Sequence, residues 1–159
     1  MKFYFSVFQL FNSSIFQFFN FPMTLLERLN ATDIFARENG IQLTEVREGY
    51  AKAEMTVGPT HINGANVCQG GAIFTLADLA FAAVCNSHGQ LTLGISNTID
   101  YLSSGRLGDH LTAEAVETVN HRKMPQCIIT VRNQHGEIIA TATGRAYRKR
   151  KPFEADALM

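Results

Sequence analysis

The spacing of apolar residues changes along the chain, and each period predicts a different element. From residue 24 to residue 38 the apolar positions recur at roughly helical spacing, and Gly40 follows them as a stop signal. Residues 50–57 instead alternate between apolar and polar side chains, as in a strand with one solvated face, and Gly49 marks a turn before them. We therefore expect one amphipathic helix over residues 24–38, followed by a hairpin of two short strands.

A longer apolar stretch over residues 70–86 predicts a second helix. Two neighbouring apolar stripes run along it at helical spacing, formed by Ile73, Leu76, Ala80 and Val84 and by Phe74, Phe81 and Cys85. A helix that is apolar on more than one side is buried rather than resting on a surface. The residues before it, 58–69, contain Pro59 and the pair Asn63–Gly64, which are typical of a loop.

The remaining pattern predicts an antiparallel run of strands. Alternating segments cover residues 92–102, 111–122, 126–134 and 137–149, with "QHGE" as the hairpin turn between the last two. The order is thus a helix, two short strands, a long buried helix and three or four strands. This order predicts an α+β fold in which one sheet wraps around one central helix.

Composition narrows the class of protein. The chain has 159 residues, of which 46% are hydrophobic and 18% charged, as in one compact domain. Lys plus Arg balances Asp plus Glu at 14 each, so the charge gives no sign of a nucleic-acid or membrane partner. The three cysteines and five histidines are scattered without metal-ligand spacing, so we expect a reducing, cytoplasmic location and no metal site.

The ends of the chain differ from its middle. Eight of the first 22 residues are Phe, but polar residues interrupt every apolar run, so neither a signal peptide nor a membrane span is clear. We expect the natural protein to start at Met23, while a docking segment for assembly and a targeting sequence stay open as alternatives. The predicted domain covers residues 23–151, and residues 152–159 are a predicted tail.

Asp78 is the one charged side chain in the apolar stretch from Gln69 to Ser87. Removing an unpaired carboxylate from water costs several kcal/mol, so a buried one must be paired, protonated or functional. A functional Asp in an apolar wall would act as a general base or a nucleophile, with its basicity raised by desolvation. An Asp that reaches the helix edge and meets water or backbone donors is an equally good interpretation.

Gly70 and Gly71 open the same helix. Unpaired N–H groups and the positive end of the helix dipole gather at a helix start, and glycine lets a ligand oxygen approach closely, which suits an oxyanion or a phosphate. The two glycines would also permit a tight turn with no further role. Eight residues of helix rise about 12 Å, so if Gly70 and Asp78 both act on one carbon, a second copy of the chain must supply one of them.

Two segments, "NGANVCQGGAIFTLADLAFAAVCNS" and "IDYLSSGRLGDHLTAEA", closely resemble the hotdog-fold acyl-CoA thioesterases, most of all the PaaI type of phenylacetate degradation. The resemblance runs from about residue 29 to residue 149. It implies the hotdog fold, a long helix wrapped by an antiparallel sheet, with chains paired into dimers and usually tetramers, and sites at the dimer interface. It implies no cofactor, since coenzyme A is part of the substrate.

The resemblance also assigns roles to catalytic residues. Asp78 matches the acid that attacks the thioester carbon or activates water, and Gly70 matches the glycine whose N–H polarises the thioester carbonyl. Asn63 matches a loop asparagine that helps to position the water or the acid. Gln69 departs from the usual HGG motif; glutamine can orient the loop through hydrogen bonds, but it cannot titrate as histidine does.

Further residues are candidates for substrate contact. They are Gly71 beside the predicted carbonyl site, Phe74 and Phe81 on either side of Asp78, Thr98 on the strand that crosses near the acyl pocket, and Arg145 and Arg148 toward the phosphates of coenzyme A. Each has an ordinary alternative: core packing for the two Phe residues, a solvated face for Thr98 and a solvated basic tail for the arginines.

The sequence therefore predicts hydrolysis of an acyl-CoA thioester to a free acid and coenzyme A, with an aryl-acetyl or a medium-chain acyl group. A non-catalytic acyl-CoA sensor is the main alternative, because hotdog domains also bind ligands and Gln69 is atypical. A hotdog dehydratase is less compatible, since its catalytic histidine near the helix start is missing here.

Overall fold

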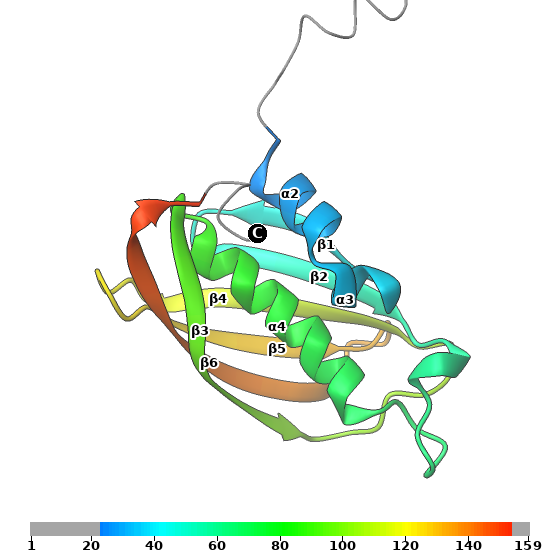
Figure 1. Ribbon diagram of the computed structural model, residues 1–159. Helices are drawn as coiled ribbons and strands as arrows, with labels where there is room; N and C mark the ends of the chain where they lie inside the picture. The colour runs from blue at the N-terminus through cyan, green and yellow to red at the C-terminus, as the bar shows by residue number, and fades with distance from the viewer. Residues whose placement is uncertain (1–22, 154–159) are drawn as a thin grey trace, which may run out of the picture.

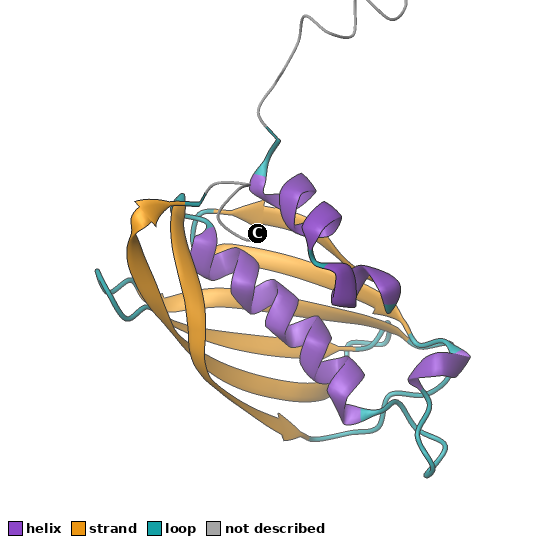
Figure 2. Ribbon diagram, in the orientation of Figure 1, coloured by secondary structure: helices purple, strands orange, loops and turns teal. Residues whose placement is uncertain are grey.

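The computed structural model describes residues 23–153. The predicted N-terminal extension and most of the predicted C-terminal tail lie outside this range. Six antiparallel strands form one curled sheet that wraps around a central helix, α4 (Gly70–Asn86), as Figures 1 and 2 show. The predicted α+β hotdog architecture is confirmed.

The first helical segment is broken where the sequence predicted one helix. Thr24 caps α2 (Leu25–Thr32) in a capping box with Glu27, and α3 (Ile34–Glu38) follows as a separate short helix. Asp33 separates them, because its backbone leaves the helical region and its carboxylate accepts the N–H of Ala36 at 3.0 Å. Asp favours such cap positions over a helix interior, and this preference ends the predicted single helix.

The hairpin predicted next is present. It consists of β1 (Ile41–Arg47) and β2 (Tyr50–Thr56), joined at Gly49, whose φ of +72° suits glycine. A loop with a short 3₁₀ turn, η1 (Pro59–His61), then leads into α4. After α4 come β3 (Gln90–Tyr101), β4 (His110–Val119), β5 (Gln126–Arg132) and β6 (Ile138–Pro152).

The strand order is β1-β2-β4-β5-β6-β3, so β3 lies at the far edge of the sheet from β1, and among the described strands it pairs only with β6. The concave face of the sheet packs on α4, whose buried residues include Ile73, Leu76, Phe81 and Val84. In the part of the chain that the structure describes, the side of α4 that carries Gly71 and Asp78 is exposed. Within residues 23–153 no helix is long and apolar enough to cross a membrane.

Candidate active site

The first turn of α4 leaves one backbone donor free. Gln69 is the N-cap, and its Oε1 accepts a hydrogen bond from the N–H of Gly71, while its backbone oxygen accepts from Ala72 at 3.0 Å. The first N–H groups of a helix have no partner inside the helix. The N–H of Gly70 makes no hydrogen bond to any other residue of the described range. Gly70 is therefore the donor that this helix start offers to a ligand oxygen.

Tyr101 holds this turn from the neighbouring strand, and the sequence did not single it out. Its hydroxyl donates to the backbone oxygen of Gly70 at 2.9 Å, and a Cβ at position 70 would lie 3.1 Å from the Tyr101 ring. Glycine at this position thus lets the ring pack against the backbone. A cleft of about 570 Å³ opens here, lined by Phe35, His61, Gln69, Gly71, Phe74 and Tyr101.

His61 lines this cleft, but its side chain forms hydrogen bonds within the fold. The side chain is buried; its Nδ1 accepts the N–H of Gly58 at 2.9 Å, and its Nε2 lies 3.0 Å from the oxygen of Asn39. Its backbone oxygen accepts the N–H of Gln69 at 2.7 Å. Both ring nitrogens are engaged, so His61 does not replace the histidine that is missing at position 69.

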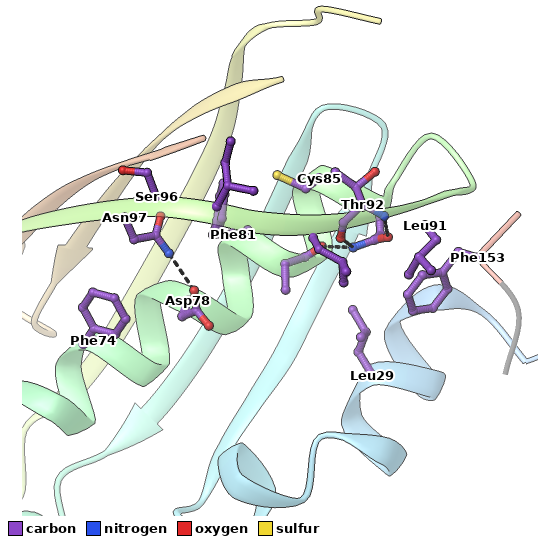
Figure 3. A pocket seen from close by; sticks show the side chains of 15 residues that line it. Leu29, Phe74, Asp78, Phe81, Cys85, Leu91, Thr92, Ser96, Asn97 and Phe153 are labelled. Atoms are coloured by element: carbon purple, nitrogen blue, oxygen red, sulfur yellow. Dashed lines mark hydrogen bonds between the residues drawn. The ribbon is translucent and has the colours of Figure 1, made fainter. Parts of the chain in front are cut away.

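Asp78 lies in the middle of α4 at the edge of a second cleft. The side chain is exposed in the single chain, which agrees with the alternative of an Asp that reaches the helix edge. The reason is that the sheet covers only part of the helix: Gly71 and Asp78 are exposed, and Phe74, Thr75 and Ala82 are only half-buried. The carboxylate is paired, because Nδ2 of Asn97 on β3 donates to its Oδ1 at 2.7 Å (Figure 3).

The surroundings of Asp78 favour its protonated form. Although the residue is exposed by surface area, neighbouring protein atoms displace part of the water around its carboxyl. This desolvation, the largest cause, and the negative charge of Asp33 raise the pKa of the Asp78 carboxyl above its usual value, while the hydrogen bond from Asn97 lowers it. The net direction is upward. The carboxylate is therefore a stronger base than an Asp in water, which suits proton abstraction or nucleophilic attack.

The cleft beside Asp78 has a volume of about 490 Å³ and lies between α4 and β3. Its apolar lining comes from Leu29, Phe74, Phe81, Leu91 and Phe153, and the structure thus brings both predicted Phe residues next to Asp78. Phe74 is half-buried at the cleft, whereas Phe81 is fully buried and also belongs to the core. The cleft has the size and character of a pocket for an apolar acyl group.

The other predicted site residues lie elsewhere. Asn63 organises its own loop, with Oδ1 accepting the N–H groups of Ala65 at 2.9 Å and Val67 at 3.3 Å. Thr98 and Arg145 share a groove of about 320 Å³ that also contains Ile128. Thr98 follows Asn97 directly in β3, so their side chains point to opposite faces of the sheet, and the structure does not bring Thr98 to Asp78.

Arg148 is not a surface cation. Its side chain is buried, and its guanidinium bonds to Glu117 at 3.1 Å and to Asn120 at 2.9 Å. These acceptors hold it at the far end of the fold, at the C-terminal end of α4. Within the described residues no group of three or more His, Cys, Asp or Glu side chains is placed to hold a metal ion.

Comparisons with known proteins agree on one family. A family profile described as thioesterase superfamily matches residues 65–140. The acyl-coenzyme A thioesterase PaaI of Escherichia coli is 37% identical over 116 residues, covering 73% of this chain and 83% of that protein. A protein from Archaeoglobus fulgidus is 46% identical over 112 residues, covering 70% of this chain and 73% of the relative.

Solved structures give the same result. The E. coli PaaI protein from the phenylacetic acid degradation operon superposes with a TM-score of 0.72 at 33% identity, covering 81% of this chain and 99% of that one. A Streptococcus mutans protein, solved with bound acetyl-CoA, superposes with a TM-score of 0.68 at 28% identity, covering 70% of this chain and 90% of that one.

Proposed function

Because this chain belongs to the PaaI-type branch of the hotdog-fold thioesterase superfamily and is a thioester hydrolase, we propose that it hydrolyses acyl-CoA at a site shared by two copies of the chain. Acyl-CoA and water give a carboxylic acid and coenzyme A. Asp78 removes a proton from the attacking water or attacks the carbonyl carbon itself, and the Gly70 N–H stabilises the developing oxyanion.

One observation carries this proposal: Asp78 is the only charged residue of α4, and it faces an apolar cleft in which its pKa is raised. A carboxylate that only made the helix surface polar would need neither the apolar cleft beside it nor the hydrogen bond from Asn97 on β3. The Gly70 donor lies on the same helix, eight residues earlier, which is about 12 Å along the axis. One chain therefore cannot place both groups on one carbonyl, and the partner's α4 supplies the second.

The surface of the single chain supports such a pairing. Within residues 23–153, β3 is an edge strand whose outer backbone groups have no partner strand, and Leu93, Ile95 and Tyr101 on it are 42%, 54% and 50% exposed. A long apolar edge of this kind invites another strand. We propose that two copies join along β3 and α4 into the minimal active dimer. Val116, Ile128 and Tyr147, exposed on other strands, support pairing of dimers into a tetramer.

The lining of the two clefts supports a proposal for the substrate class. Phe74 belongs to both clefts, and aromatic side chains contribute much of the lining of each. Flat aromatic groups stack well on such walls. We propose an aryl-acetyl or medium-chain acyl-CoA as substrate and Arg145 as the remaining candidate for a phosphate contact. The enzyme is expected in the cytoplasm, in keeping with the free state of all three cysteines.

The test is hydrolysis of a panel of acyl-CoA thioesters, followed by thiol release. We expect the parent to hydrolyse at least one aryl-acetyl or medium-chain substrate and Asp78→Asn to lose about 10³-fold or more in kcat, as when a general base is removed. Glu45→Gln, an exposed carboxylate-to-amide change on β1 at the opposite edge of the sheet from β3, is the matched control and should keep parent activity. Parent-like activity in Asp78→Asn would remove Asp78 from the reaction. Tight acyl-CoA binding without any turnover by the parent would instead identify a sensor.

A further inference from the structure

We propose that Asn97 is a positioning residue of this site, which holds Oδ1 of Asp78 and leaves Oδ2 as the oxygen that reacts. The inference rests on the proposed function of Asp78. The 2.7 Å bond from Asn97 Nδ2 is the one hydrogen bond to the Asp78 carboxylate among residues 23–153. In Figure 3 the Asn97 side chain points from β3 toward Asp78, whereas its neighbour Ser96 points away.

The amide oxygen of Asn97 supports the view that the side chain is oriented to donate to Asp78. Oδ1 of Asn97 is buried without a hydrogen-bond partner, and a Cβ on Gly144 would lie 2.5 Å from it. An unpaired buried carbonyl costs about 1–3 kcal/mol. Turning the amide around would place this oxygen against the Asp78 carboxylate, and the two acceptors would repel each other. If the residue at position 97 served only to fill space beside Gly144, an apolar side chain would suffice. The hydrogen bond that Asn97 donates to Asp78 gives a reason for an amide at this position.

The hydrogen bond from Asn97 opposes the other influences on the ionisation of Asp78. Asp33, from the α2–α3 corner, is the charged side chain that acts on Asp78 within the described residues, and it disfavours ionisation. The cleft contributes only the neutral thiol of Cys85 as a further titratable group, from α4 itself. From β3, Asn97 supplies the one influence that lowers the pKa of Asp78, and its N–H therefore keeps the carboxylate ionised against burial and Asp33.

The test compares the pH dependence of kcat in the parent, Asn97→Leu and Asn97→Asp. Leu has nearly the shape of Asn without the N–H, and Asp places a second carboxyl beside Asp78. We expect the acid limb of kcat to move up by about one pH unit in Asn97→Leu and further in Asn97→Asp, because two adjacent carboxyls share a proton. KM should stay within about twofold, since the amide is not proposed to contact substrate. The Glu45→Gln control on β1 should retain the parent profile.

A second readout needs no activity. The Asp78 carboxyl is titrated by carbon-13 NMR in the parent and in the variants, and a higher pKa in Asn97→Leu supports the inference. If Asn97→Leu does not fold, Asn97→Asp, which preserves volume, carries the test. Unchanged NMR and kcat profiles in a folded variant, alongside an inactive Asp78→Asn, would overturn the role of Asn97 alone. An active Asp78→Asn would instead overturn the proposed function.

Discussion

Asp78 illustrates at the scale of one residue how a proposed reactive group lowers stability. Its pKa is raised in the folded chain, so folding favours the protonated form. The ionised carboxylate therefore lowers the free energy of unfolding at any pH above the folded-state pKa. As the pH falls through that value toward the ordinary pKa of Asp, this loss of stability disappears.

A prediction follows for the melting temperature. Asp78→Asn removes the charge but keeps an oxygen that can accept the Asn97 N–H, so it should melt at a higher temperature than the parent at pH 7. The difference should shrink at about pH 4, where the parent carboxyl gains a proton. Differential scanning calorimetry at the two pH values measures it. A variant that melts below the parent at pH 7 would show that the ionised group stabilises the fold.

The residue scale also shows what sequence patterns can and cannot locate. Asp78 and Gly70 were found because each is unusual within a helix that periodicity predicts well. Asn97 and Tyr101 were missed, because a polar or aromatic residue on a strand is ordinary until the partner on α4 is known. Alternation did separate the two faces of β3, but it could not tell which face meets the helix. Thr98, predicted as a substrate contact on this strand, lies on the face opposite to the one from which Asn97 reaches Asp78.

At the scale of elements, one glycine allows β6 and β3 to close on α4. A Cβ at position 144 would overlap the ring of Phe81 and lie 2.5 Å from Oδ1 of Asn97. Both neighbours are held in place, Phe81 by the core and Asn97 by Asp78. The cleft beside Asp78 therefore depends on a missing side chain on β6.

Gly144→Ala should accordingly lower the free energy of unfolding by about 1–3 kcal/mol, as is usual for overpacking. Gly64→Ala is the matched control, because a Cβ there has no neighbour within 4 Å and should change stability little. Urea denaturation of both variants gives the comparison. Equal midpoints for Gly144→Ala and the parent would mean that β6 can shift without strain.

Elements were predicted better than their ends. The central helix, the Gly49 hairpin and the late strands were all expected from periodicity and turn residues, because one buried face repeats over many positions. The break at Asp33 was not, since the apolar spacing of residues 24–38 continues through it and the cap depends on one side chain. Pairing between distant strands, such as β3 beside β6, has no local signal, and the sequence did not predict it.

At the scale of the whole molecule, the exposed side of α4 and the outer edge of β3 are surfaces that the rest of residues 23–153 does not cover. Both belong to the proposed interface, and the proposed donor and carboxylate lie about 12 Å apart on one helix. The central claim is therefore that each active site combines Asp78 of one copy with Gly70 of another.

Mixing two inactive variants tests this claim most directly. Gly70→Pro removes the N–H at the first helical position, where proline is tolerated, and Gln69 already has extended backbone angles, φ −64° and ψ 131°. Gly70→Ala keeps the N–H but makes the same contact with Tyr101, and it serves as the control for packing.

We predict that Gly70→Pro and Asp78→Asn are each nearly inactive, and that co-expression restores about a quarter of parent activity. Half of randomly assembled dimers are then mixed, and each of these holds one intact site out of two. Hydrolysis that stays at the level of the single variants, although mixed dimers are shown by mass spectrometry to form, would contradict a site shared between two copies.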